Sequence, residues 1–192
     1  MKSIYLDNAA TTAVCAEASD AALHAMTSVY GNPSSTHRFG REAKALLDTS
    51  RESVASALGC RSEELVFTSC GTESDNWAIR GAAHANRHVG KDIISSMAEH
   101  DAVRKTLDQM EKDGWEVTRL KPDKSGAIPA DSVADALRAD TALVTLMMVN
   151  NETGAVMPIA QMAKLTHRIC PDAIFHTDAV QGFLKVPFSA KT

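Results

Sequence analysis

The chain has 192 residues, with 20 lysines and arginines against 24 aspartates and glutamates, and a formal net charge of −4 at pH 7. A chain of this length can bury a sizeable core, and its 44% hydrophobic and 23% charged residues are typical of a globular protein. The composition therefore excludes a disordered or fibrous chain, and the slight acidic excess argues against nucleic acid as a partner.

No apolar run in the sequence nears the ~20 residues of a membrane span, and residues 1–7 lack the basic and apolar regions of a secretion signal. We therefore expect a cytoplasmic protein without a membrane partner. The four cysteines are Cys15, Cys60, Cys70 and Cys170. Their wide spacing favours reduced thiols over a disulfide framework or a zinc site.

The amino-terminal part of the sequence predicts two amphipathic helices. Small and apolar residues recur at helical spacing over 14–30 and stop at Gly31, a residue type that commonly ends a helix. Ser35 or Thr36 can cap the second helix, whose apolar stripe continues up to Gly59. We expect helices here rather than part of a sheet.

After residue 60, short apolar runs alternate with stretches of helical spacing. The runs predict strands over 65–68, 92–96, 115–120, 142–149 and 173–177. The spacing predicts helices over 72–85, 100–112, 131–139 and 159–169, the last beginning at Pro158. This order is typical of an α/β fold with a mainly parallel sheet covered by helices on both faces. We therefore expect an amino-terminal helical segment over 1–60 and an α/β domain over 61–192.

Residues 68–74 (TSCGTES) follow the first predicted strand and open a helix. Ligands of parallel sheets bind beyond the carboxyl ends of the strands, and the free N–H groups at a helix start attract anions. Gly71 would let a phosphate approach closely, and Thr72 would add a hydroxyl donor. Taken alone, such a motif is more often an ordinary helix cap.

Polar residues also follow three of the later predicted strands. They are Glu99-His100, residues 150–154 (NNETG) and residues 178–181 (DAVQ). Each of these is common as a cap or a surface group when it occurs alone. Because the carboxyl ends of parallel strands share one edge of the sheet, their joint placement predicts a site for a flat, phosphorylated, nitrogen-containing cofactor.

Pyridoxal 5′-phosphate (PLP) fits each part of this predicted site. Asp178 would keep the pyridinium nitrogen protonated, so that the ring acts as an electron sink. His100 would stack on the ring face and could move protons. Asn151 and Gln181 would bond the ring hydroxyl and the substrate carboxylate.

The motifs also resemble those of a known family, the cysteine desulfurases among the class V, fold-type I PLP enzymes. The resemblance runs from Tyr5 to about Pro187. It rests on residues 5–12 (YLDNAATT), 31–35 (GNPSS), 37–40 (HRFG), 66–69 (VFTS), 71–74 (GTES), 99–100 (EH), 149–154 (VNNETG) and 176–181 (HTDAVQ). Their occurrence in this order is far more specific than any single block.

The resemblance implies a role for each of the predicted site residues. Cofactor binding falls on Gly71, Thr72, His100, Asn151, Asp178 and Gln181, and His100 is also the catalytic residue. At Cys70 the family often has glycine, and we expect a packed small residue there rather than an active thiol.

The resemblance also implies residues that this sequence does not contain. In the family a lysine that follows a histidine forms the Schiff base with PLP, and a later cysteine carries the persulfide. Lys185 and Lys191 do not follow a histidine. We therefore expect the chain by itself to be inactive and its PLP to be absent or bound noncovalently.

The function that the resemblance implies is sulfur mobilisation from L-cysteine, which gives alanine and an enzyme persulfide for iron–sulfur cluster assembly. The chain would be the amino-terminal half of such an enzyme. Two alternatives stay open: a noncatalytic fragment that binds a cofactor or partner, and half of a related selenocysteine lyase or aminotransferase. Expected partners are a second copy or a complementing second-half chain, and an iron–sulfur scaffold protein.

Overall fold

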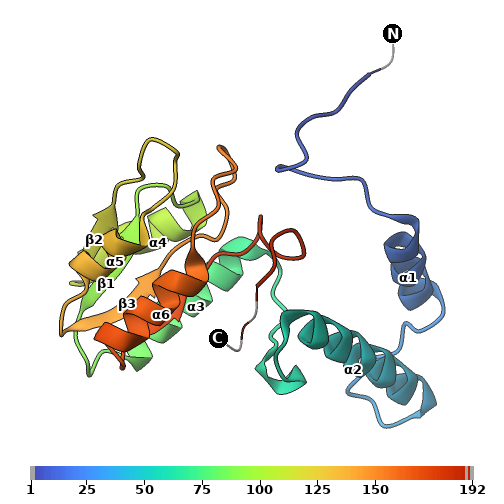
Figure 1. The fold of residues 1–192 in the computed structure, drawn as a ribbon. Helices are drawn as coiled ribbons and strands as arrows, with labels where there is room; N and C mark the ends of the chain where they lie inside the picture. The colour runs from blue at the N-terminus through green and yellow to red at the C-terminus, as the bar shows by residue number, and fades with distance from the viewer. Residues whose placement is uncertain (1–2, 189, 191–192) are drawn as a thin grey trace. The chain divides into compact units, whose positions relative to one another are not determined.

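The structure is a computed structural model that describes residues 3–188 and 190. It divides into two compact units, with the boundary between Phe67 and Thr68 (Figure 1). Within these residues, no helix combines the length and the apolar character that crossing a membrane would need.

The first unit is helical. It contains α1 (Ala16–Thr27), α2 (Arg38–Leu58) and the short 3-10 helix η1 (Ser62–Glu64). Ala43 of the predicted stripe of α2 is buried together with Ala55, and Gly59 follows the last residue of the helix in the left-handed conformation with φ of 74°. Both predicted helices form and α2 ends before Gly59 as predicted, but α1 buries none of its residues.

Two details of the predicted helix ends are wrong. Ser28, and not Gly31, follows the last residue of α1. A Cβ on Gly31 would lie 2.3 Å from the backbone oxygen of Phe39, so the glycine allows a close approach of two backbone segments. The cap of α2 is His37, whose side chain accepts the N–H of Gly40 at 3.3 Å, instead of Ser35 or Thr36.

The second unit is an α/β domain with a parallel sheet, as predicted. Its strands are β1 (Asp92–Ser96), β2 (Glu116–Leu120), β3 (Thr141–Thr145) and β4 (Ile174–His176), in the spatial order β2-β1-β3-β4. Its helices are α3 (Gly71–Ala85), α4 (Asp101–Lys112), α5 (Ala130–Ala136) and α6 (Ile159–Ile169). Each of the three strand pairs is parallel.

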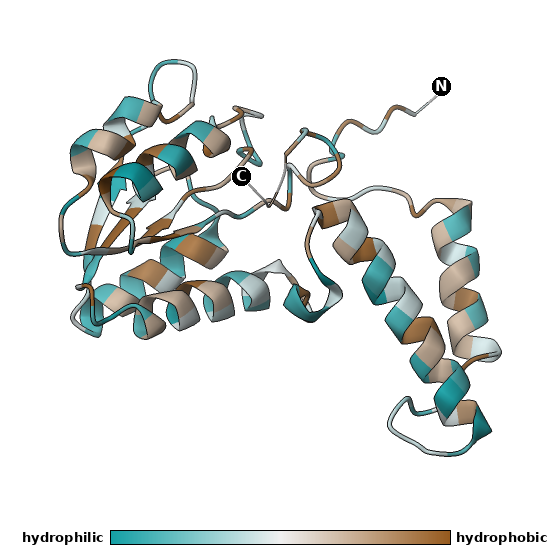
Figure 2. Ribbon diagram, turned by 60° about the horizontal axis from the view of Figure 1, so that its bottom comes forward, coloured by the Kyte–Doolittle hydropathy of each residue, from teal (hydrophilic) through white to brown (hydrophobic). Residues whose placement is uncertain are grey.

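Helices cover both faces of this sheet. Ile93 of β1 and Leu143 of β3 share a core with side chains of α3 and α4. The next residues along the same strands, Ile94 and Val144, pack with side chains of α5 and α6. Successive strand residues point to opposite faces, so β1 and β3 are buried on both faces of the sheet. Figure 2 shows that hydrophobic and hydrophilic residues alternate along the helices that cover the sheet.

The predicted strand over 65–68 does not form, so this prediction is wrong. None of the four strands pairs with this segment. Instead the guanidinium of Arg51 donates to the backbone oxygen of Leu65 at 2.5 Å and lies 4.8 Å from the ring centre of Phe67. Strand propensity is local, whereas a strand exists only where a neighbour supplies the hydrogen-bonding ladder.

Candidate functional site

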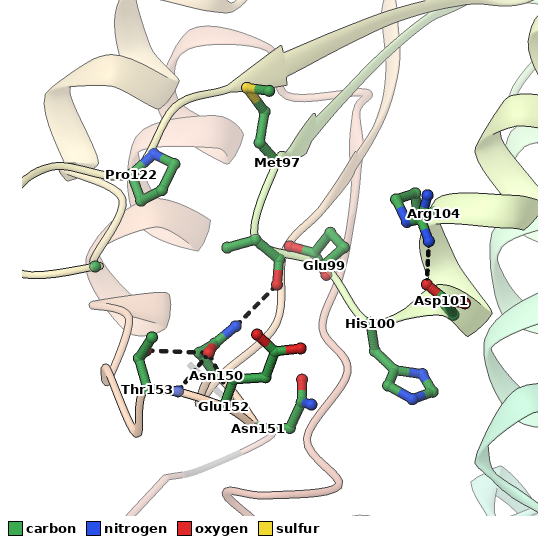
Figure 3. A pocket seen from close by; sticks show the side chains of 12 residues that line it. Met97, Glu99, His100, Asp101, Arg104, Pro122, Asn150, Asn151, Glu152 and Thr153 are labelled. Carbon is green, nitrogen blue, oxygen red and sulfur yellow. Dashed lines mark hydrogen bonds and ion pairs between the residues drawn. The ribbon is translucent and has the colours of Figure 1, made fainter.

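The loops after β1, β2 and β3 line an open hollow of about 620 Å³ at the carboxyl edge of the sheet (Figure 3). Its lining includes His100 from the loop after β1 and Asn151 from the loop after β3. A smaller hollow of about 270 Å³ lies between α3 and α4, and its lining includes Thr72 and His100. His100 therefore borders both hollows, and the structure brings these three predicted site residues together.

The start of α3 also lies against the loop that follows β4. A Cβ on Gly71 would come within 3.3 Å of Cγ2 of Val180, two residues after Asp178. Thr72 is exposed at this end of the helix. Since the first N–H groups of a 15-residue helix carry its positive end, an anion could be held here.

Cys70 immediately precedes α3 and is exposed, so the expectation of a packed side chain is wrong. Hydrogen bonds from the backbone of Glu73 and the side chain of Ser69 lower the pKa of its thiol. The position stands open to solvent because it belongs to the helix start and not to the core.

His100 caps α4, a role that the sequence analysis did not foresee. Its Nδ1 accepts the N–H of Ala102 at 3.1 Å, and the ring is otherwise exposed. A neutral imidazole that accepts at Nδ1 carries its proton on Nε2. Figure 3 shows the ring and the amide of Asn151 on the same side of the hollow.

Glu99 joins the ends of β1 and β3 from inside the protein. Its Oε1 accepts from Oγ of Ser96 at 2.5 Å and from the N–H of Met147 at 3.1 Å. Burial raises the pKa of this carboxyl to about 7, and these hydrogen bonds only partly oppose the shift. The sequence marks Glu99 as part of a motif, but only the structure shows that it is buried and joins two strand ends.

Asp178 and Gln181 lie on one tight loop after β4. The carboxylate of Asp178 is buried and accepts the N–H of Val180 at 2.9 Å. Its backbone oxygen accepts the N–H of Met148 at 2.8 Å, which ties the loop to the end of β3. Gln181 is half-buried three residues later. A cationic nitrogen could pair with Asp178 here.

The helix start, the imidazole and the buried carboxylate therefore occupy one region of the second unit. They come from three loops that are far apart in the sequence. The arrangement can hold an anion at α3, a flat group beside His100 and a cation at Asp178.

The model of the aminotransferase class-V family matches residues 4–192. The chain is 45% identical to the cysteine desulfurase IscS of Methanosarcina thermophila over 99% of this chain and 46% of that protein. It is 42% identical to the putative cysteine desulfurase IscS 1 of Bacillus subtilis, over 100% of this chain and 50% of that protein.

Two solved structures have the same fold. A NifS-like protein superimposes with a TM-score of 0.94 at 33% identity, over 98% of this chain and 52% of that one. SspA in complex with cysteine superimposes with a TM-score of 0.88 at 36% identity, over 94% of this chain and 52% of that one. The chain spans about half the length of the curated relatives it matches. It belongs to the aminotransferase class-V family, and the relatives it matches are cysteine desulfurases.

Proposed function

We propose that this chain is the cofactor-binding half of a PLP-dependent cysteine desulfurase. The observation that carries the proposal is the position of His100, which borders one hollow with Thr72 and another with Asn151. Groups that suit a phosphate, a flat ring and a polar substrate thereby meet at one edge of the sheet.

PLP has a phosphate, a flat ring and a basic ring nitrogen, and the residues present fit all three. Gly71 and Thr72 would hold the phosphate at the start of α3, and Asp178 would pair with the ring nitrogen. Gln181 and Asn151 would bond the ring oxygen and the substrate. When bound, PLP supplies an electron sink for bond cleavage next to an amino group.

His100 would cover the ring and move protons. Its Nδ1 is engaged by the N–H of Ala102, so Nε2 is the atom that would hold or pass on a proton. The helix cap fixes the direction of the ring before any ligand arrives. Such preorganisation is what a group in proton transfer needs.

L-cysteine is the proposed substrate. The cysteine bound to SspA and the family of the relatives support it. We propose that the lysine and the persulfide cysteine needed for turnover come from residues outside these 192, and that the acceptor of the sulfur is an iron–sulfur scaffold. We also propose that the protein is cytoplasmic and assembles with a second copy of itself or with a complementing chain.

Binding of PLP is the first test. Titration of the chain with PLP should give a saturable change in visible absorbance, and Asp178→Ala should weaken binding at least tenfold. The matched control is Asp172→Ala, which removes an exposed aspartate from the turn before β4 and should leave binding unchanged. Equal binding by both variants would remove Asp178 from the site.

Turnover is the second test. The chain is mixed with PLP, L-cysteine, the carboxyl-terminal half of the Methanosarcina thermophila relative and a reducing thiol that releases persulfide sulfur as sulfide, and alanine and sulfide are measured. Equal amounts of the two products are expected from the mixture and neither from this chain alone. PLP binding without either product in the mixture would favour a noncatalytic fragment.

A further inference from the structure

A polar residue ends the buried stripe of α3. The side chains that this helix turns toward the sheet are Asp75, Ile79 and Ala83, which recur every four residues and are buried. Ile79 and Ala83 belong to the hydrophobic core, as the spacing of such a stripe predicts. Asp75 stands at the end next to the candidate site, where an apolar side chain would be buried without a desolvation cost. The proposed function gives Asp75 no role, so its burial calls for an explanation.

The sheet presents two polar side chains to this end of α3. Thr145 is the last residue of β3 and His176 is the last of β4, and the two are register partners. Each comes two residues after an apolar side chain of the core that α3 shares, Leu143 and Ile174, so both face α3. Nδ1 of His176 lies 2.8 Å from Oγ1 of Thr145, and its Nε2 lies 3.8 Å from Oδ1 of Asp75. His176 therefore stands between the sheet and the first turn of the helix.

The same histidine begins the backbone segment that leads to Asp178. The N–H of Leu146 donates to the backbone oxygen of His176 at 3.1 Å, and the N–H of Met148 donates to that of Asp178 at 2.8 Å. Both donors belong to the chain that follows β3. Hydrogen bonding to this chain therefore continues beyond the end of β4, and it fixes Asp178 relative to His176.

His176 also reaches the start of α3. Asp75 lies three residues after Thr72 on this helix, and residues at this spacing are neighbours on a rigid α-helix. The first N–H groups of a helix lack partners within it, so its first turn depends on contacts from outside. The near contact of Gly71 with Val180 lies at the surface, because Val180 is 61% exposed. The contact of Asp75 with His176 is buried.

We propose that His176 is a positioning residue: by holding the first turn of α3 through Asp75, it sets the spacing between the anion site at that helix start and the carboxylate of Asp178. The inference rests on the proposed binding of PLP, whose phosphate and ring nitrogen are a fixed distance apart on one rigid ring. A rigid ligand gains affinity only where both of its ends meet their partners together. Without the link, each end of the site should still bind a small ligand, but the two ends should no longer match PLP.

Hydrogen exchange of the free chain tests the link without a ligand. His176→Ala should speed the exchange of the amides over 74–78, in the first turns of α3, by about tenfold, and leave those of α4 unchanged. The matched control is His167→Ala, which removes an exposed histidine of α6 and should exchange like the wild type. Faster exchange by the same factor in both helices would show a general loss of stability and overturn the inference.

A double variant tests whether the link runs through Asp75. Asp75→Ala should speed the exchange of the same amides as His176→Ala does. If the two side chains act through each other, the double variant should exchange no faster than the faster single variant. Multiplying effects would mean that the side chains act independently, and the proposed link would then be wrong.

Ligands that fill one end or both ends of the site test the spacing. Pyridoxine 5′-phosphate has the phosphate and ring of PLP but no aldehyde, so it forms no imine with surface lysines. His176→Ala should weaken its binding about tenfold, and weaken the binding of pyridoxine or of inorganic phosphate by less than about twofold. His167→Ala should bind all three ligands like the wild type. An equal loss for inorganic phosphate would place the effect at the helix start alone and contradict a role in spacing.

Two conservative variants separate the two nitrogens of the imidazole. The amide of asparagine can bond to Thr145 as Nδ1 does but is too short to reach Asp75, whereas the longer glutamine can place its amide near the position of Nε2. His176→Gln should therefore restore most of the affinity for pyridoxine 5′-phosphate, and His176→Asn should not. Equal recovery by asparagine would show that the bond to Thr145 suffices, against the inference.

The outcomes separate the two proposals. If the wild type binds neither PLP nor pyridoxine 5′-phosphate, the proposed function fails, and hydrogen exchange still decides whether His176 holds α3. If the wild type binds both and His176→Ala binds them as tightly, the inference fails alone.

Discussion

The side-chain nitrogen of Asn150 donates to the backbone oxygen of Ala98 at 2.9 Å and so joins the loop after β3 to the loop after β1. Its Oδ1 accepts the N–H groups of Glu152 and Thr153 at 3.1 and 2.8 Å. The next residue, Asn151, is only half-buried and lines the hollow. Asn150 thus joins two loops from inside the protein, whereas the adjacent Asn151 lies at the surface of the hollow.

Asn150→Ala should destabilise the chain by about 2–3 kcal/mol, because it removes the hydrogen bonds of three partly buried backbone groups. Asn151→Ala should change the free energy of unfolding by less than about 0.5 kcal/mol and weaken PLP binding instead. Urea unfolding and PLP titration of both variants check this contrast. Equal losses of stability would mean that Asn151 is also structural.

His100→Ala should lose about 1 kcal/mol of stability with the helix cap, as well as PLP affinity. His100→Asn separates the two effects, since asparagine caps helices well but has no aromatic face. We expect near wild-type unfolding for His100→Asn, with PLP binding as weak as in His100→Ala. Recovery of both properties by asparagine would show that the imidazole acts only as a cap.

Glu99 should make stability fall as the pH rises. Its folded-state pKa is about 7 against an ordinary 4.5, so between these values the folded chain holds a proton that the unfolded chain has lost. The stabilisation is complete below pH 4.5 and is lost as the pH passes about 7. Asp75 acts in the same direction, whereas the lowered pKa of His176 acts in the opposite one below pH 6.5.

Glu99→Gln removes one of these contributions. From pH 5 to pH 8 the variant should gain stability relative to the wild type, by on the order of 2 kcal/mol. Urea unfolding at the two pH values measures the change. Glu152→Gln, which alters an exposed carboxyl of the same hollow, should follow the wild type. A parallel course for Glu99→Gln would show that Glu99 is ionised in the folded chain.

Gly182 should not tolerate a side chain. A Cβ there would lie 2.3 Å from Sδ and 2.8 Å from Cγ of Met148, so Gly182→Ala should cost about 1–3 kcal/mol. Met148→Ala opens a cavity by itself, but the double variant should cost less than the sum of the two. Gly81→Ala is the control, since its nearest atom would be 4.0 Å away. Additive costs would rule out the clash.

Much of the fold can be predicted from local pattern. The four paired strands and all four helices of the second unit lie within a few residues of their predicted ranges, because period and capping residues act over short stretches. Local pattern could not show that the apolar run over 65–68 forms no strand. Its apolar residues have strand propensity, but pairing depends on a neighbour that sequence period does not reveal.

The residues of the site likewise fall into those that local pattern predicts and those that only the folded structure reveals. His100 and Asp178 follow predicted strands of one parallel sheet, and the carboxyl ends of such strands share one edge. Thr72 follows no strand in the described part of the chain, although it lines the same hollow as His100. No pattern pointed to Asp75 or to a structural task for Glu99. Their behaviour follows from burial and from neighbours such as His176, a hundred residues away in the chain in the case of Asp75.

The sequence by itself determined the parallel α/β architecture, the motifs at the strand ends and the family to which they belong, since each is written in short stretches of residue types. Only the tertiary structure decided which strands pair and which acids are buried, so that the pKa of Asp75 and Glu99 is raised. Charge and pairing depend on the distance to groups that the chain folds into contact, and that distance has no local signal in the sequence.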